Sequence, residues 1–235
     1  MINKIASYLS IFNRKIKYKK ISYSLNAVDL IIDYIFKDKD IGTYVDVGAQ
    51  HPISNNNTYL LFKRGWNGIN IDLDRKNIDL FNLSRPNDIN LNYAISDKEG
   101  ETDFYFYHES SPINTLNKKV KEYQKAKISE IKKINTFTLN NVFKKINFDK
   151  NIDYLNIDVE GYEDKVLSGF DINKYKPSVV SVEYLDLKMK KLEFKNNNLD
   201  NLLSSNIYKY FNDNNYYFVN WLHSDLIFIH KDFRD

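Results

Sequence analysis

The sequence contains no cysteine, only seven glycines and four prolines among 235 residues, and no apolar run long enough to cross a bilayer. The missing cysteines exclude disulfides, thiolate metal ligands and cysteine nucleophiles, and they suit a reducing compartment. The first residues also lack the long apolar core of a signal peptide, so the expected location is the cytoplasm. A formal charge of +3 is too small to indicate a nucleic-acid partner.

A chain of this length can bury a large core and is expected to form one α/β domain with additions. We expect residues 1–21 to be a basic amphipathic extension and residues 22–235 to be the single domain, with a charged helical insertion at about 108–135. Four apolar residues of the extension share one helical stripe, namely Ile2, Ile5, Leu9 and Phe12. Weak contact with a membrane surface or an acidic partner is one interpretation of this segment. Loose packing on the domain, or a solvated face, is the favoured one.

A short β-branched run, Tyr44 to Val47, leads directly into a turn made by Gly48 and Ala49, and a helix-compatible segment follows from Asn57 to Arg64. A strand, a glycine turn and a helix N-terminus are the opening of a nucleotide-binding βαβ unit, in which Gly48 would let the backbone approach a ligand. Asp46, at the end of the strand, can accept hydrogen bonds from a cationic or hydroxylated ligand. A tight turn without a ligand explains Gly48 equally well.

A second acidic residue favours the ligand-binding interpretation. The run Gly68 to Asp72 also has the pattern of a strand, and it ends in a carboxylate. Asp72 lies 24 positions (72 − 48) after Gly48, which is near the spacing at which a dinucleotide or adenosyl fold places a carboxylate on ribose hydroxyls. A solvated charge at the end of a strand is the alternative.

The strongest signal is the run Asp158-Val159-Glu160-Gly161-Tyr162-Glu163 at the end of a predicted strand, Ile152 to Val159. In open α/β sheets the carboxyl edge is where ligands bind. Asp158 and Glu160 are two positions apart, so both side chains point the same way in an extended segment. Two like charges close together cost free energy unless a cation, a proton or hydrogen-bond donors compensate them. The alternative is that both residues cap the following helix, Tyr162 to Phe170.

The rest of the chain alternates between predicted strands and helices until its last two strands. Further strands are expected at Ile89 to Ile95, Thr102 to Tyr107, and Pro177 to Tyr184, which contains Glu183 near its end. Helices are expected at Leu25 to Phe36, Asn77 to Leu83, Lys118 to Lys133, Leu139 to Phe148, and Leu199 to Phe211. The runs Tyr216 to Trp221 and Leu226 to His230 are separated by four residues, so they must form an antiparallel pair. This order predicts a mostly parallel Rossmann-like sheet with a C-terminal antiparallel pair and helices on both faces.

At these motifs the sequence resembles the FkbM family of S-adenosylmethionine (SAM)-dependent methyltransferases. The resemblance covers roughly Ser22 to Tyr184 and rests on Asp46-Val47-Gly48-Ala49, the strand ending in Asp72, Ala94-Ile95-Ser96-Asp97 and Asp158-Val159-Glu160-Gly161-Tyr162-Glu163. The runs His51-Pro52 and Gly65 to Asp72 resemble the branch found with surface-polysaccharide biosynthesis genes. The resemblance implies a class I methyltransferase fold with SAM as cofactor and a sugar or nucleotide sugar as the small-molecule substrate.

The resemblance also implies which residues bind the cofactor. These are Asp46, Gly48, Ala49 and Gln50 at the methionine part, Asp72 at the ribose hydroxyls, and Ala94, Ile95 and Ser96 beside the adenine. The methyl group would then point over the carboxyl end of the strand that runs into Asp158.

Methyl transfer to a hydroxyl is an in-line displacement at the methyl carbon of a sulfonium, and a base must take the hydroxyl proton as the new bond forms. Asp158 or Glu160 is the first candidate for this base, followed by His223 in the terminal hairpin and then by His51. A structural role is the simpler interpretation of each histidine. Asp158 and Glu160 could instead hold Mg²⁺, which would orient a sugar diol and lower the pKa of its hydroxyl, but the favoured assignment contains no metal.

The leading hypothesis is therefore a SAM-dependent O-methyltransferase that acts on a sugar hydroxyl in a nucleotide sugar or in a capsule or lipopolysaccharide glycan. A nicotinamide-dependent sugar oxidoreductase or epimerase is the second hypothesis, and the missing Gly-x-Gly-x-x-Gly pattern speaks against it. A non-catalytic adenosyl-binding module is the third. The sequence makes no prediction of the oligomeric state.

Overall fold

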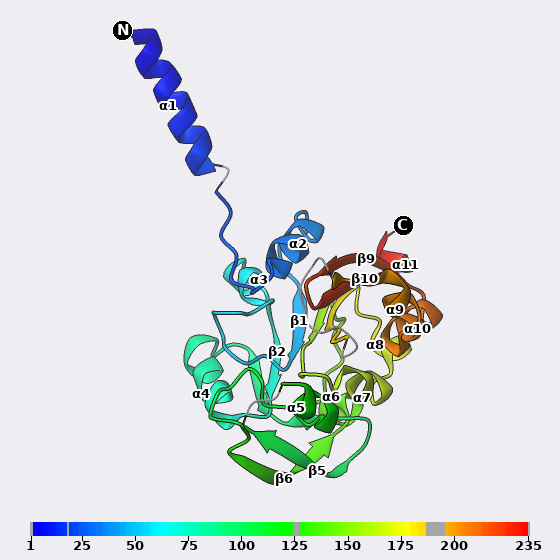
Figure 1. The fold of residues 1–235 in the computed structure, drawn as a ribbon. Coiled ribbons are helices and arrows are strands. Elements are labelled where there is room, and N and C mark those ends of the chain that lie inside the picture. The colour runs from blue at the N-terminus through cyan, green and yellow to red at the C-terminus, as the bar shows by residue number, and fades with distance from the viewer. Residues whose placement is uncertain (1, 18, 125–126, 187–195, 235) are drawn as a thin grey trace.

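The computed structural model describes residues 2–17, 19–124, 127–186 and 196–234. Its centre is a seven-stranded sheet in the order β3-β2-β1-β7-β8-β10-β9 (Figure 1). The strands are β1 (Thr43–Val47), β2 (Asn67–Asp72), β3 (Ile89–Asn92), β7 (Tyr154–Ile157), β8 (Val179–Glu183), β9 (Tyr216–Leu222) and β10 (Asp225–His230). The first five strands in this order are parallel, and β10 runs antiparallel to both β8 and β9. The prediction of a mostly parallel sheet with an antiparallel final pair is confirmed.

Helices occupy most of the predicted positions, but two predicted helices, Lys118 to Lys133 and Leu199 to Phe211, differ from the structure. They are α1 (Ile2–Lys17), α2 (Val28–Ile35), α3 (Tyr59–Lys63), α4 (Arg75–Ser84), α5 (Lys118–Gln124), α6 (Leu139–Lys145), α7 (Glu163–Ser168), α8 (Ile172–Tyr175), α9 (Leu199–Leu203), α10 (Asn206–Asp213) and α11 (Lys231–Arg234). The segment predicted as one helix from Leu199 to Phe211 is two helices, α9 and α10. The break occurs because the Ser205 side chain accepts a hydrogen bond from the backbone N–H of Tyr208, which caps a new helix.

Helices pack on both faces of the large sheet because successive side chains of a strand point to opposite sides. In β1, Tyr44 belongs to an apolar cluster with α2 and α3, whereas Val45 and Val47 belong to a larger cluster with α6, α7 and α10. The strands β1, β7 and β8 are buried along almost their whole length, as parallel strands covered on both faces must be.

A second sheet, in the order β4-β6-β5, corrects the prediction of a single strand from Ile89 to Ile95. The chain leaves the large sheet after β3 and enters β4 (Ala94–Ile95), which pairs with β6 (Glu130–Phe137). The third strand of this small sheet is β5 (Gly100–Phe106). The predicted strand is therefore divided between two sheets at Tyr93.

The predicted charged helix from Lys118 to Lys133 is wrong in its second half. Helix α5 covers the first part of this range, residues 125–126 lie outside the described residues, and β6 occupies the end. Strand β6 is held by antiparallel pairing with β5, and the Lys132 ammonium lies 3.9 Å from the centre of the Phe106 ring. The partner strand thus supplies the contacts that override the helical propensity of this lysine-rich segment.

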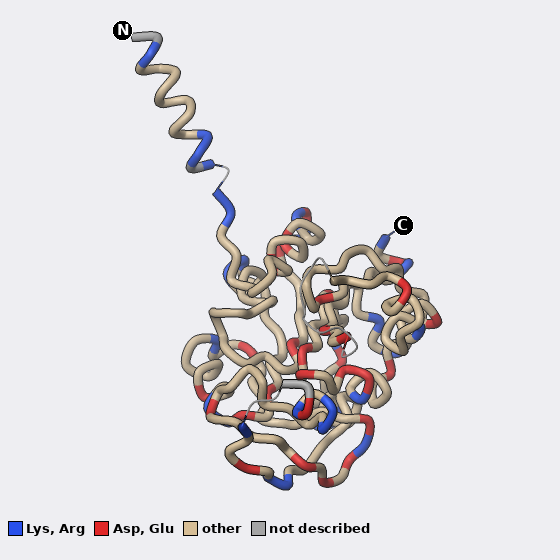
Figure 2. The backbone as a smooth tube through the Cα atoms, in the orientation of Figure 1, with Lys and Arg blue, Asp and Glu red and all other residues tan. Residues whose placement is uncertain are grey.

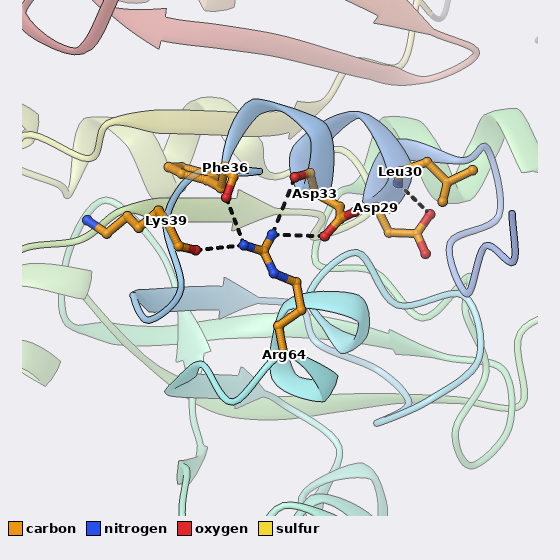
Figure 3. A network of polar contacts seen from close by, with 6 residues as sticks. All are labelled: Asp29, Leu30, Asp33, Phe36, Lys39 and Arg64. Carbon is orange, nitrogen blue, oxygen red and sulfur yellow. Dashed lines mark hydrogen bonds and ion pairs between the residues drawn. The ribbon is translucent and has the colours of Figure 1, made fainter. Parts of the chain in front are cut away.

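Arg64 fixes how the chain enters β1 (Figure 3). Its guanidinium donates hydrogen bonds to the Asp33 Oδ1 atom at 2.8 Å and to the carbonyl oxygens of Phe36 at 2.8 Å and Lys39 at 2.6 Å. Carbonyls at the end of a helix lack partners within the helix. Arg64 satisfies these groups beyond α2 and ties α3 to the segment that precedes β1.

The N-terminal helix α1 stands apart from the rest of the molecule (Figure 1). The predicted amphipathic helix is confirmed over Ile2–Lys17, and every described side chain of α1 is exposed. Loose packing on the domain is therefore not what the structure shows. Among the described residues, no helix is long and apolar enough to span a membrane.

Candidate active site

A cavity lies at the carboxyl ends of the parallel strands, and the register of the sheet explains which residues meet there. Val47 of β1 pairs with Ile71 of β2 and with Ile157 of β7, and Ile157 pairs with Val182 of β8. The residues that follow these four form one row across the edge of the sheet. In strand order this row is Asp72, Gly48, Asp158 and Glu183, and all four line the cavity. The row thus contains three carboxylates around one glycine.

Most of the predicted site residues line this cavity. They are Asp46, Gly48, Ala49, Gln50, Asp72, Ala94, Ile95, Asp158 and Glu160. Three candidates lie outside its lining. Ser96 is buried, and its hydroxyl donates to Asp97 Oδ1 at 3.0 Å. The Nδ1 atom of His51 accepts the backbone N–H groups of the next turn, and His223 occupies the β9–β10 turn with a φ of 54°.

Gly48 is required by close packing between β1 and the end of β7. Its φ is +85°, and a Cβ placed there would lie 1.7 Å from the carbonyl oxygen of Asp158. The backbone N–H groups of Gly48 and Ala49 both donate to the carbonyl oxygen of Ile71, at 2.8 and 3.1 Å. The glycine therefore lets the ends of β1, β2 and β7 converge at the floor of the cavity.

Asp72 is a buried carboxylate held by three donors, so it is not the solvated charge considered as an alternative. Its Oδ2 atom accepts the backbone N–H of Gln50 at 2.8 Å, and its Oδ1 atom accepts the N–H of Asp74 at 2.7 Å and the amide of Asn77 at 3.1 Å. Burial raises the pKa of Asp72 from 3.8 to about 6, and these donors oppose the rise. The side chain is ionised at neutral pH and retains lone pairs for ligand hydroxyls.

Asp46 belongs to a second buried polar group, two residues before Gly48 in β1. Its Oδ1 atom accepts the amide of Asn156 at 2.8 Å, and its Oδ2 atom accepts the Thr58 hydroxyl at 2.9 Å and the Asn56 amide at 3.2 Å. The fully buried Arg85 donates to the same Thr58 and Asn56 side chains at 2.9 and 2.8 Å. Burial raises the pKa of Asp46, whereas these donors and the Arg85 charge lower it.

The carboxylates at the ends of β7 and β8 form a cluster. One oxygen from each of Asp158, Glu160 and Glu183 lies within 4.8 Å of the others. Burial, and then the neighbouring negative charges, raise the pKa values of Asp158 and Glu183 well above their ordinary range. Burial and the charge of Glu163 raise the pKa of Glu160 to about 8. A cluster of this kind can accept a proton or bind a cation.

Glu163 holds the turn that presents this cluster. Its Oε1 atom accepts the backbone N–H groups of Val159 at 2.9 Å and Gly161 at 3.1 Å. Burial raises the pKa of Glu163 to about 7, and these two bonds oppose the rise. The acid that organises the start of α7 is therefore Glu163, and neither Asp158 nor Glu160 caps that helix as the alternative interpretation required.

Amide side chains also line the cavity, among them Asn26 and Asn57. Asn57 donates to Asn156 Oδ1 at 3.0 Å, and Asn26 donates to Asp225 Oδ2 at 3.2 Å. The loop before α5 closes another side, because the Thr115 hydroxyl donates to the Glu160 carbonyl oxygen at 2.7 Å. The first part of the insertion predicted at about 108–135 thus contributes to the site, although the end of that range belongs to strand β6.

The strand order, the reversed final pair and the ligand cavity at the carboxyl ends of the parallel strands define a class I methyltransferase fold. The family model described as the methyltransferase FkbM domain matches residues 46–211, and the chain belongs to that family. A solved structure similar to this chain is a TehB-like SAM-dependent methyltransferase from Corynebacterium glutamicum. The two share 10% identity with a TM-score of 0.42, over 98% of this chain and 100% of that one. No curated protein sequence matches the chain significantly.

Proposed function

We propose that the protein is a SAM-dependent O-methyltransferase whose acceptor is a sugar hydroxyl, in a nucleotide sugar or in a capsule or lipopolysaccharide glycan. Membership of a methyltransferase family supports the reaction class. The observation that carries the proposal is the row Asp72-Gly48-Asp158-Glu183, which places acids on both sides of a glycine at the cavity floor. A ligand with a ribose diol and a cationic centre suits such a row.

The residues around the cavity fit SAM, which supplies an activated methyl group on a sulfonium when bound. Asp72 would accept hydrogen bonds from the ribose hydroxyls with the lone pairs that its three donors leave free. Gly48 and Ala49 would form the wall beside the methionine part. The buried Oε2 atom of Glu183 has no hydrogen-bond partner among the described residues, so this end of the cavity suits a positively charged ligand.

The remaining assignments follow the predicted pattern. Asp46 would attract the ammonium group of the methionine part by its charge. Its carboxylate oxygens already accept hydrogen bonds from Asn156 and Thr58. Gln50 would contribute its backbone, whose N–H already orients Asp72. The adenine would lie beside Ala94 and Ile95, with Ser96 behind them.

Asp158 or Glu160 would take the acceptor proton as the carbon–oxygen bond forms. A base works best when its pKa is near the operating pH, and the pKa of Glu160 is raised to about 8. His223 and His51 are second choices because neither lines the cavity. The amide side chains of Asn26 and Asn57, which also line the cavity, suit an acceptor rich in hydroxyls. The proposal includes a cytoplasmic location, which suits a chain without cysteine.

Calorimetry of the purified protein with SAM and with NAD tests the cofactor. Micromolar binding of SAM and no binding of NAD are expected, and the reverse result would overturn the proposal. Transfer of a labelled methyl group from SAM to a panel of nucleotide sugars tests the acceptor. Asp158→Asn and Glu160→Gln should reduce transfer while SAM binding survives, and Glu109→Gln, an exposed carboxylate paired with Lys76, is the matched control.

A further inference from the structure

Three carboxylates converge at the ends of β7 and β8. One oxygen from each of Asp158, Glu160 and Glu183 lies within 4.8 Å of the other two. Glu183 is only 7% exposed, and its buried Oε2 atom accepts no hydrogen bond from the residues that the structure describes. In the part of the chain that the structure describes, no lysine or arginine forms an ion pair with any of the three. Such a group requires compensation by a ligand or by protons.

The backbone is shaped to bring these acids together. Asp158 and Glu183 follow paired residues of adjacent parallel strands, so their positions are set by the sheet. Glu160 has a φ of 55°, which is uncommon for a residue with a side chain and costs free energy. The turn is held by Glu163 from one side and by the Thr115 hydroxyl from the other. The fold thus maintains a strained turn that carries Glu160 to the other two acids.

The spacing of the oxygens fits one cation. Metal–oxygen distances of about 2.0–2.6 Å, from Mg²⁺ to Ca²⁺, place the farthest ligand oxygens about 4.0–5.2 Å apart, and the three carboxylate oxygens lie within 4.8 Å of one another. The three side chains offer only carboxylate oxygens, which are the ligands that Mg²⁺, Mn²⁺ and Ca²⁺ prefer. No cysteine exists in the chain to favour a softer metal.

We propose that Asp158, Glu160 and Glu183 bind one hard divalent cation, Mg²⁺ or Mn²⁺, with open positions that face the cavity. Two adjacent hydroxyls of the acceptor would occupy these positions, and the cation would lower the pKa of the hydroxyl that attacks the methyl group. Carboxylate oxygens not bound to the cation remain available for the proton. The cation site itself stands on the three side chains, whereas the role toward the acceptor rests on the proposed function.

Titration of the full-length, chelator-treated protein with Mn²⁺ alone tests the site, with binding followed by electron paramagnetic resonance. Saturable binding of one Mn²⁺ per chain is expected, with competition by Mg²⁺. Glu183→Gln removes one of three charged ligands and should weaken Mn²⁺ binding by about tenfold or more. Asp158→Asn provides a second variant, and Glu109→Gln is the control that should bind Mn²⁺ as the wild type does. Absence of Mn²⁺ binding to the wild type, or equal binding by all variants, would overturn the site.

Failure of this site and failure of the proposed function give different results. SAM binding and methyl transfer that persist unchanged in excess chelator would overturn the role of the cation toward the acceptor and leave the methyltransferase proposal intact. One Mn²⁺ bound without any SAM binding would support the site and remove the proposed function. Methyl transfer that is lost in chelator and restored by Mg²⁺ would support both.

The N-terminal helix supports a second inference, independent of the cavity. Three residues on one stripe of α1, Ile5, Leu9 and Phe12, are each more than half exposed, at 56%, 53% and 51%. The first 20 residues contain six basic residues and no acidic one; the basic residues are Lys4, Arg14, Lys15, Lys17, Lys19 and Lys20. Figure 2 shows this helix and the segment after it as a positively charged arm that points away from the body.

We infer that α1 lies on an anionic membrane surface, with its apolar stripe inserted among the acyl chains and its basic residues at the headgroups. A helix with one apolar face, a basic polar face and low overall hydrophobicity binds at such an interface. Charge complementarity favours anionic lipid as the binding partner of this segment, because residues 1–20 contain no acidic residue that could pair with a basic partner. The apolar stripe would also gain burial that it lacks in the isolated chain.

Co-sedimentation of the full chain with vesicles tests this surface, using equal parts of phosphatidylglycerol and phosphatidylcholine against phosphatidylcholine alone. Binding to the anionic vesicles should exceed binding to the neutral ones and should weaken at high salt. Leu9→Glu should weaken binding by about tenfold or more, since it replaces a membrane-inserted apolar side chain with a charge. Leu83→Glu, at an 82% exposed leucine of α4, is the matched control. Equal binding by both variants, or sedimentation velocity showing that α1 instead pairs two copies of the chain, would overturn the inference.

Discussion

Replacing Asp72 with asparagine tests the buried carboxylate at the end of β2. The substitution preserves the shape of the side chain but removes its charge, and it turns an NH₂ group toward one of the backbone N–H donors of Gln50 or Asp74. This mismatch costs the same free energy at every pH. The contribution that changes with pH comes from the carboxyl group alone, so it can be isolated by comparing the two proteins.

The size and sign of that contribution follow from the Asp72 pKa. Burial raises it from 3.8 in an ordinary environment to about 6 in the folded protein, so the folded state binds this proton more tightly than the unfolded chain does. The contribution of the Asp72 carboxyl group to the unfolding free energy is fully present below pH 3.8 and is lost as the pH rises through about 6. Between about pH 5 and pH 7 the loss amounts to about 1.3 kcal/mol.

Urea unfolding of the cofactor-free wild type and Asp72→Asn measures this loss. The difference in unfolding free energy between the two proteins should shift by about 1.3 kcal/mol from pH 5 to pH 7, with the variant relatively more stable at the higher pH. Asp40→Asn, at an exposed carboxyl group, controls for the loss of one acidic residue. If the unfolding free energies of the wild type and the variant differ by the same amount at pH 5 and pH 7, the burial of Asp72 is refuted.

The same residue predicts how SAM binding depends on pH. Ribose hydroxyls donate to the ionised carboxylate, so protonation of Asp72 competes with the cofactor. With a free-protein pKa of about 6, SAM affinity should fall by about tenfold from pH 7 to pH 5. In Asp72→Asn the affinity should be weaker throughout, and this decline should be absent. An equally steep decline in the variant would assign the pH dependence to another group.

Three further substitutions test the packing around the cavity. In Gly48→Ala the new Cβ would meet the Asp158 carbonyl oxygen at 1.7 Å, so the unfolding free energy should fall by about 3 kcal/mol or more. Gly65→Ala, also at positive φ but in open space, should lose only about 1 kcal/mol, and equal losses in urea would contradict the close packing. Arg85→Met should lose about 3–5 kcal/mol because it removes buried hydrogen bonds to Pro52, Asn56 and Thr58, and a loss under about 1 kcal/mol would contradict that burial. Glu183→Gln removes one of three crowded negative charges. Without metal and cofactor, the Tm of this variant should therefore exceed the Tm of the wild type at about pH 8 and match it at about pH 5. Calorimetry that shows no difference in Tm at either pH would contradict the cluster.

The strands that carry the cavity could be predicted from sequence because burial on both faces makes each a mostly apolar run, interrupted by a single polar residue such as Asp46 in β1 or Asn156 in β7. In β2 and β7 that run stops abruptly at an acid, Asp72 or Asp158, and the change marks the edge of the sheet. The glycine after β1 was ambiguous between a tight turn and a ligand contact. The structure adds a specific reason for it, since the space a Cβ would need is taken by the Asp158 backbone.

Glu183 and Arg85 could not be assigned to the site from the sequence. Glu183 also ends a predicted strand, but its membership of the acid cluster depends on β8 lying beside β7, which no local pattern reveals. Arg85 precedes a proline at the end of α4, where an exposed side chain is the usual outcome. Its burial depends on acceptors supplied by Asn56 and Thr58 in the segment between β1 and α3, and these are contacts between distant parts of the chain.

The error at β6 has a related cause. Residues 130–133 read Glu-Ile-Lys-Lys, a pattern that fits a solvated helix as well as an exposed strand. The choice is made by β5, whose Phe106 ring packs against Lys132 and whose backbone pairs along the whole of β6. Strand preference of this kind resides in the partner strand, and sequence periodicity within one segment cannot detect it.

The distance between strands gives the acids at the edge of the sheet separate roles. Adjacent strands lie about 4.8 Å apart, so Asp158 and Glu183 are close enough to share one cation or proton, as their convergence with Glu160 shows. Asp72 lies two strands away from Asp158, about 10 Å along the row, and Gly48 fills the position between them without a side chain. Asp72 therefore keeps its own donors and its own pKa, independent of the cluster. A ligand across this gap would meet one carboxylate suited to hydroxyl groups and, beyond the glycine, the acid cluster proposed to hold the cation and the acceptor, which is the order in which SAM would present its ribose and its methyl group.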